Sequence, residues 1–303
     1  MTDNPGKNVS LVLGSGGARG LAHIGIIHWL EKHGYCVQSI SGCSMGAVIG
    51  GIYAAGKLDE YERWVCAVDK MDIVSLLDFS WRRGGLVKGE KIIDLLRELV
   101  GDQNIENLPI RFTAVAADIK AEKEVWIQKG CLFDAMRASM SLPMFFTPFE
   151  YKGAMLIDGG VLNPVPIAPT FSDHTDLTIA VNLGGRVRPN IPKKVTIRER
   201  DANERSDLRD SINRFIERLQ NTISRDGDDD VLGVYDIANQ AFDAMQGTIS
   251  RAKLAAYPPD KVVTIPRNAC GILEFDRARE MIELGYESAR EQLGNDDAGK
   301  DRV

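Results

Sequence analysis

The feature that most constrains the fold is a strand, a glycine-rich turn and a helix that follow one another twice near the N-terminus. An apolar strand, VSLVLG (9–14), leads through the turn GSGGARG (14–20) into a helical pattern ending at Gly34. A second strand, YCVQSIS (35–41), leads through GCSMGA (42–47) into a small, apolar, helix-like run. Successive units of this kind pack as a mostly parallel sheet with helices on both faces, so the sequence predicts an α/β fold.

The rest of the chain continues this alternation. Helical patterns fill residues 58–100, and IRFTAVAADI with EKEVWIQ predicts a β-hairpin. A helix (FDAMRASMS) and two strands (AMLID and LTIAVNL) follow. Nearer the C-terminus the patterns predict a helix over 231–255, a strand KVVTIP (261–266) and a last helix over 274–293.

Charge density divides the chain into segments. We expect a main domain over 9–185, a charged linker and helix over 186–230, C-terminal helices and a strand returning to the main domain over 231–294, and a disordered tail over 295–303. The helix at 205–225 either packs on its own domain or presents an apolar face to a partner or membrane. That face has helical spacing and consists of Ile212, Phe215, Ile216, Leu219 and Ile223.

Composition narrows the class of protein. A net charge of −6 argues against a nucleic-acid partner and against electrostatic capture by anionic lipid headgroups. The longest apolar stretches fall short of the ~20 residues that cross a bilayer. Five cysteines without a C-x-x-C pair favour a reducing cytoplasm and no zinc site. We therefore expect a cytoplasmic protein, and composition makes no prediction of its oligomeric state.

Ser44 lies at the centre of a G-x-S-x-G sequence, between the second strand and its helix. A sharp strand-to-helix turn exposes a serine hydroxyl for attack, and Gly42 and Gly46 would let the strand double back against the helix. Ser44 is therefore a candidate nucleophile; the alternative is a plain glycine-containing turn. Its neighbour Cys43 is interpreted as a small buried residue rather than as a nucleophile.

The turn at 14–20 predicts an anion site, because glycines before a helix direct backbone N–H groups toward one point. The glycine spacing does not match a dinucleotide-binding fingerprint, and no G-K-[ST] follows for a P-loop. An oxyanion hole remains. The candidate donors, with Arg19 either supporting the loop or facing an anionic substrate, are Ser15, Gly16, Gly17, Ala18, Arg19 and Gly20.

A nucleophilic serine needs a base, and two residues qualify. His23, His28 and His33 lie on the first predicted helix and are expected to be surface or packing residues, which leaves His174 for a triad in the order serine, aspartate, histidine. The alternative is Asp158, which ends the strand AMLID before Gly159 and Gly160. An aspartate there could reach Ser44 directly.

Together these elements resemble the patatin-like phospholipase family, over roughly residues 9–185. The similarity rests on GSGGARG, GCSMG, DGG (158–160) and the intervening RASMSLPMFF. The segments VYDIANQAFDAMQ and EFDRAREMIELGYESA are similar to the bacterial RssA-type branch and to the catalytic part of neuropathy target esterase. The resemblance implies a three-layer patatin-like α/β fold with a mainly helical C-terminal extension, and a catalytic dyad of Ser44 and Asp158 without histidine.

The resemblance implies acyl transfer from a lipid or simpler carboxyl ester through an acyl-enzyme, with no metal or cofactor. Such an enzyme would contact membranes peripherally, at the inner face. WRRGGLVKGEK (81–91) is a candidate lip of the entrance, and the candidate acyl-chain pocket contains Met140, Leu142, Met144, Phe145 and Phe146. Two other hypotheses stay open: an esterase with a Ser44–Asp–His174 triad, and a non-catalytic adaptor that binds a partner.

Overall fold

The computed structural model describes residues 6–68, 72–73, 76, 79–80, 86–189 and 234–294. The chain divides into two compact units, one of residues 1–189 with 246–303 and one of residues 190–245. The first unit contains the sheet. The predicted tail lies outside the described residues, as do the predicted helix at 205–225 and most of the predicted charged linker.

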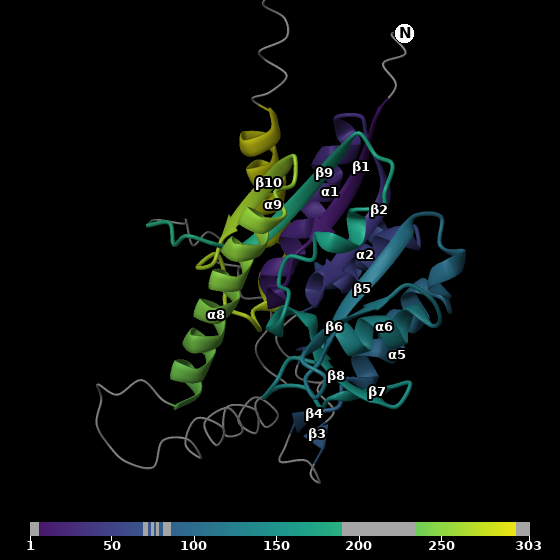
Figure 1. Ribbon diagram of the computed structural model, residues 1–303, viewed down its shortest axis with the longest axis vertical. Coiled ribbons are helices and arrows are strands. Elements are labelled where there is room, and N and C mark those ends of the chain that lie inside the picture. Colours follow the sequence, from purple (N-terminus) through teal and green to yellow (C-terminus); the bar gives the residue numbers. More distant parts are fainter. Residues whose placement is uncertain are drawn as a thin grey trace, which may run out of the picture. The chain divides into compact units, whose positions relative to one another are not determined.

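A single large sheet forms the centre of the first unit (Figure 1). Its order is β10-β9-β1-β2-β5-β8-β7, with β6 paired to β5. The strands from β10 to β5 are parallel, whereas β6, β7 and β8 enter antiparallel pairs. The predicted mostly parallel α/β sheet is confirmed. The strands are β1 (Lys7–Leu13), β2 (Tyr35–Cys43), β5 (Arg111–Asp118), β6 (Lys123–Ile127), β7 (Phe149–Tyr151), β8 (Ala154–Asp158), β9 (Leu177–Gly185) and β10 (Lys261–Pro266).

Helices flank this sheet. The α-helices are α1 (Ala22–Lys32), α2 (Met45–Ala54), α3 (Leu58–Val65), α5 (Glu90–Val100), α6 (Leu132–Ser139), α8 (Val234–Ala256) and α9 (Ala278–Leu293). Short 3-10 turns are η1 (Gly17–Leu21), η3 (Ile105–Asn107), η4 (Gly159–Val161), η5 (Ala168–Thr170) and η6 (Phe275–Arg277). Every helix predicted within the described residues is present, and the first and last begin as 3-10 turns.

Side chains of β1 alternate between two packed faces. Leu13 points toward α2, where a Cβ at Gly50 would lie 3.2 Å from its Cδ1. Val12 belongs to a cluster on the other face with Val165 and Ile167, against which Leu254 of α8 packs. Both faces of β1 are therefore covered, which explains why its residues from Val9 onward are buried without alternation.

The C-terminal segment returns to the core through α9. This helix packs against α1 so closely that a Cβ at Gly25 would lie 1.9 Å from the carbonyl oxygen of Ile282. This packing is consistent with the burial of most of α1, which includes Ile24, Ile26, Ile27, Trp29 and Leu30.

The prediction for residues 58–100 was incomplete. Between α3 and α5 the structure contains a small antiparallel pair, β3 (Phe79–Ser80) with β4 (Leu86–Val87). Val87 also forms a bridge with Phe146. These strands have two residues each, too few for periodicity to distinguish them from a loop.

Candidate active site

The register of β5 brings the ends of β2 and β8 together. Both β2 and β6 pair with Ala114 and Val115, so they lie on opposite flanks of β5. Both β6 and β8 pair with Ala116, so β8 lies on the same flank as β2. Cys43 at the end of β2 is opposite Val115, and Asp158 at the end of β8 is opposite Ala116. Ser44 and Asp158 therefore meet although 114 positions separate them.

The two side chains are in direct contact. The Ser44 hydroxyl donates to Asp158 Oδ2 with an oxygen-to-oxygen distance of 2.5 Å. Asp158 is fully buried and Ser44 is 8% exposed, so little water competes for this hydrogen bond. A serine proton already directed at a carboxylate is arranged for transfer when the oxygen attacks.

Burial changes the proton affinity of Asp158. Desolvation raises its pKa from 3.8 to about 6, because a charged carboxylate is disfavoured away from water. Donation from Ser44, from the Gly160 N–H at 2.7 Å and from the Cys43 thiol partly offsets this rise. The carboxylate is thus a stronger base than an exposed aspartate and is still ionised at neutral pH.

Ser44 has a strained backbone, with φ 55° and ψ −123°. Such conformations cost about 1–3 kcal/mol and persist only where the surroundings hold them. The Ser44 N–H donates to Ser139 Oγ at 2.9 Å, and that hydroxyl donates to the carbonyl of Val115 at 2.7 Å. Helix α2 also lies close to β1, since a Cβ at Gly46 would be 2.1 Å from the Leu13 carbonyl oxygen. These contacts hold Ser44 at the tip of the turn.

The glycine-rich turn (14–20) lies against both the turn that contains Ser44 and the DGG segment (158–160). A Cβ at Gly20 would approach Met45 Cγ to 2.4 Å, and one at Gly160 would approach Ser15 Oγ to 2.6 Å. The three motifs that the sequence analysis selected are therefore adjacent in space.

Backbone hydrogen bonds distinguish four of the six candidate oxyanion donors, Ser15, Gly16, Gly17 and Ala18. The Ser15 N–H donates to the Pro164 carbonyl and the Ala18 N–H donates to the Ile272 carbonyl, each at 2.8 Å. Within the described residues, the N–H groups of Gly16 and Gly17 have no protein acceptor. These two are therefore the N–H groups best placed to receive an oxyanion.

Arg19 and His23 support this turn from inside the protein. Arg19 is buried, and its guanidinium donates to the carbonyls of Gly16 at 3.2 Å and Arg267 at 2.8 Å. His23 Nε2 donates to the Gly14 carbonyl at 2.9 Å, and burial lowers the pKa of His23 to about 4. His23 is thus a neutral packing residue. Of the two open interpretations of Arg19, the contacts favour support of the loop.

The structure does not bring His174 to Ser44. His174 is exposed, next to Asp173, which accepts from Ser10 Oγ at 2.9 Å near the beginning of β1. Ser44 follows the opposite end of the parallel strands. Cys43 is buried, and desolvation raises the pKa of its thiol, which keeps it protonated. His174 is therefore not placed to act as the base of a triad, whereas Cys43 is the small buried residue that its sequence context predicts.

Sequence reasoning missed Ser139 and Ser141. Besides the contact of Ser139 with Ser44, the carbonyl of Ser141 accepts from the Asp158 N–H at 2.9 Å. Both residues lie in the RASMS segment, which contributed to the resemblance but received no role. Both serines are fully buried in the structure, and the available sequence signal was two serines at the end of the predicted helix FDAMRASMS.

One group of described side chains has metal-ligand chemistry. His28 of α1 and the carboxylates of Asp59 and Glu62 of α3 lie within 4.8 Å of one another. His28 Nε2 is already 2.6 Å from Glu62, so the arrangement is explained as a contact between two helices. It includes neither Ser44 nor Asp158.

No described helix has both the length and the apolar character needed to span a membrane.

Comparison with known proteins identifies relatives of the chain. An uncharacterized NTE family protein of Mycobacterium tuberculosis is 38% identical over 94% of this chain and 91% of its own length. The lysophospholipase nte1 of Emericella nidulans is 29% identical over 95% of this chain, which corresponds to 18% of that protein. VipD from Legionella pneumophila, a solved structure, superposes with a TM-score of 0.47 at 15% identity, covering 96% of this chain and 67% of VipD.

The sequence pattern of the patatin-like phospholipases matches residues 11–171, which is more than half of the chain. This range includes the glycine-rich turn, Ser44 and Asp158. Together with the extent of the similarity to NTE family proteins, the match shows that the chain belongs to the patatin-like phospholipase family, a family of lipid hydrolases.

Proposed function

We propose that the protein is a serine lipid acyl hydrolase that cleaves carboxyl esters of phospholipids, lysophospholipids or simpler lipids through an acyl-enzyme. The observation that carries the proposal is the 2.5 Å hydrogen bond from the Ser44 hydroxyl to Asp158 within a buried site. Membership of a lipid hydrolase family and the fungal lysophospholipase relatives support lipid esters as the substrate class.

In the first half-reaction, Ser44 Oγ attacks the ester carbonyl while its proton moves to Asp158. The carbonyl oxygen becomes an oxyanion, which accepts from the N–H groups of Gly16 and Gly17. Collapse of this intermediate breaks the ester bond, and the proton on Asp158 passes to the departing alcohol. Water then gives a proton to Asp158 and attacks the acyl-enzyme. The bond between the acyl carbon and Ser44 Oγ breaks, Asp158 returns the proton to Ser44 Oγ, and the fatty acid leaves.

Substitutions test the dyad directly. Ser44→Ala and Asp158→Asn should each abolish hydrolysis of a p-nitrophenyl ester and of a lysophospholipid, whereas His174→Ala should retain wild-type rates. Asp158→Asn preserves the shape of the side chain, so this variant should fold, and circular dichroism checks that it does. Loss of activity in His174→Ala would restore the triad hypothesis.

A fluorophosphonate probe separates an enzyme from an adaptor. Such probes phosphonylate activated serines, so wild-type protein should be labelled at Ser44 and Ser44→Ala should not. Absence of labelling in wild-type protein that turns over no ester would exclude both enzyme hypotheses and favour the partner-binding adaptor.

Peripheral contact with an anionic lipid surface forms part of the same proposal. Beyond the ends of β9 and β10, Val187 is 52% and Leu273 44% exposed. Three arginines near these two side chains are also exposed: Arg186, Arg188 and Arg267. None of the three forms an ion pair with a carboxylate among the described residues. Backbone hydrogen bonds join the two strand ends, including Arg267 N–H to the Gly185 carbonyl at 3.1 Å. This local chemistry suits anionic headgroups although the chain carries a net charge of −6.

Vesicle binding tests this contact. The protein should cosediment with phosphatidylglycerol-containing vesicles more than with phosphatidylcholine vesicles, and added salt should weaken the binding. Replacing the three arginines by glutamine should remove the preference without changing turnover of a water-soluble ester. Equal binding to both vesicle types would contradict the proposed contact.

A further inference from the structure

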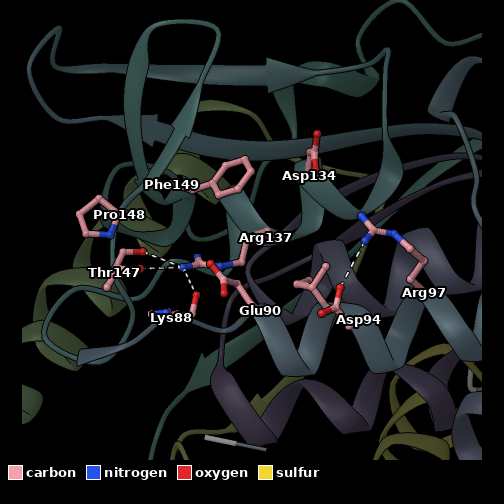
Figure 2. Close-up of a pocket in the computed structure, with 10 residues that line it drawn as sticks. Lys88, Glu90, Asp94, Arg97, Asp134, Arg137, Thr147, Pro148 and Phe149 are labelled. Carbon is pink, nitrogen blue, oxygen red and sulfur yellow. Dashed lines mark hydrogen bonds and ion pairs between the residues drawn. The ribbon is translucent and has the colours of Figure 1, made fainter. Parts of the chain in front are cut away.

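Arg137 of α6 is a buried arginine outside the dyad, 5% exposed, at the wall of a cavity of about 420 Å³ between α5 and α6 (Figure 2). Its guanidinium reaches three separate segments of the chain. It donates to Ser141 Oγ at 2.6 Å, to the carbonyl and hydroxyl oxygens of Thr147 at 2.9 and 3.1 Å, and to the carbonyl of Lys88. Burial of a guanidinium is costly, and these acceptors offset the cost.

Two of these acceptor residues, Ser141 and Thr147, stand at the two ends of one loop. Ser141 begins the segment 141–147 and Thr147 ends it, while Met144 between them has φ 68° and is 60% exposed. Arg137 therefore closes the loop at its base. Hydrogen bonds of 2.9 Å between Val87 and both Phe145 and Thr147 attach the same loop to β4.

The base of this loop contacts both members of the dyad. The Ser141 carbonyl accepts from the Asp158 N–H at 2.9 Å, and Ser139, two residues earlier, accepts from the Ser44 N–H at 2.9 Å. Ser141 Oγ also donates to the Arg137 carbonyl at 2.7 Å, so its hydroxyl is held from two directions. Because the Ser141 carbonyl accepts from the Asp158 N–H, a displacement of Ser141 also displaces the backbone of Asp158.

We propose that Arg137 is a positioning residue for the reaction: by closing the 141–147 loop it holds the Ser141 carbonyl, and through it the Asp158 carboxylate, in hydrogen-bonding register with Ser44. The proposal rests on the proposed function, because it assigns Arg137 a role in that reaction. It also gives the loop that contains the candidate acyl-pocket residues a fixed base beside the dyad.

Arg97 provides a matched control. It lines the same cavity, but it is on α5, pairs with Asp94 at 3.3 Å and Asp102 at 3.0 Å, and within the described residues makes no hydrogen bond or ion pair with the 141–147 loop (Figure 2). Arg137→Gln and Arg97→Gln thus each remove one guanidinium from one cavity, and the proposal assigns a catalytic effect to the first alone.

Active sites are first counted with the fluorophosphonate probe, so that misfolded protein does not contribute to kcat. Arg137→Gln should lower kcat per titrated site about 10- to 100-fold, since misplacement by about 1 Å can cost 100-fold. The acidic midpoint of its pH profile should rise, because a looser contact with Ser44 stabilises the Asp158 carboxylate less. Arg137→Lys should recover part of the rate, and Arg97→Gln should match wild type in both readouts.

Two outcomes overturn the proposal. One is an Arg137→Gln variant with wild-type kcat per titrated site and an unchanged pH midpoint, even if its Tm is lower. The other applies if Arg137→Gln does not fold: Ser141→Ala and Thr147→Val each remove one acceptor, and wild-type kcat in both would contradict the role of Arg137. If both lower kcat and shift the midpoint upward, the proposal is supported.

Amide hydrogen exchange keeps this test separate from the proposed function. Loss of Arg137 should speed exchange in a peptide that contains residues 141–158, and Arg97→Gln should not. If wild-type protein hydrolyses no ester and takes no probe, the proposed function fails while exchange still measures the loop. Unchanged exchange in Arg137→Gln would then refute the positioning of Asp158.

Discussion

Replacing Asp158 by asparagine should stabilise the protein while abolishing its activity. In wild-type protein, burial raises the pKa of Asp158 from 3.8 to about 6, so the folded state resists the loss of this proton. A folded pKa above the unfolded value contributes stability that is present below pH 3.8 and is lost as pH rises through about 6. At 1.36 kcal/mol per pKa unit, the loss is about 3 kcal/mol above pH 6.

Asparagine at position 158 has no charge to desolvate. Its carbonyl can accept from the Gly160 N–H and the Cys43 thiol, as Asp158 Oδ1 does, and its amide can donate to Ser44 Oγ, so each polar contact of the wild-type carboxylate has an equivalent. We therefore expect the variant to be more stable than wild type by up to about 3 kcal/mol at pH 8, with a gap that narrows by more than 1 kcal/mol at pH 5.

Urea denaturation at the two pH values measures the free energies of unfolding. At about 2 °C per kcal/mol for a domain of this size, the Tm should rise by about 6 °C at pH 8. Asp102→Asn is the control, because its side chain is 81% exposed and its replacement relieves no burial of a charge. An Asp158→Asn variant that is no more stable than wild type at pH 8 would refute the reasoning.

The ionisation of Asp158, the contact of Ser139 and the packing of α1 each give one further prediction. The value of kcat/KM should fall as pH drops through about 6, where Asp158 becomes protonated and cannot accept the Ser44 proton; a profile flat to pH 5 would contradict this. Ser139→Ala leaves the Ser44 N–H without its acceptor, so it should cost about 1–3 kcal/mol of stability in denaturant titrations and lower kcat. Gly25→Ala should cost about 3 kcal/mol or more, because its Cβ would lie 1.9 Å from the Ile282 carbonyl, whereas Gly34→Ala meets nothing within 4 Å and should cost only about 1–2 kcal/mol from its φ of 76°.

The α/β sheet could be predicted because each of its parallel strands is apolar and is followed by a distinct turn or helix. The contact between Ser44 and Asp158 could be predicted only as one of two alternatives, the other being a triad with His174. The proximity of Ser44 to Asp158 depends on β8 joining the flank of β5 that β2 also occupies, and short strands such as β8 contain no signal for the strand they will pair with.

The supporting contacts were harder to foresee for a different reason. Ser139 and Arg137 act through backbone groups of Ser44, Lys88 and Thr147, and every residue offers the same backbone groups. The sequence therefore does not indicate which residues Ser139 and Arg137 contact. His23 illustrates the same point, since its place beneath the Gly14 carbonyl follows from burial on a helix that α9 covers from outside.

Because consecutive residues of β5 face Cys43 and Asp158, the spacing of the dyad is independent of the length of chain that connects its members. Insertions in the loops between α2 and α3, or between β6 and α6, would add loop-closure entropy that grows only logarithmically with length. A single residue inserted within β5 between Val115 and Ala116 would instead move Asp158 along the strand by about 3.3 Å and turn alternate side chains to the other face. Tolerance of large loop insertions together with intolerance of a one-residue insertion in β5 is thus the mutational signature of a site assembled by strand pairing.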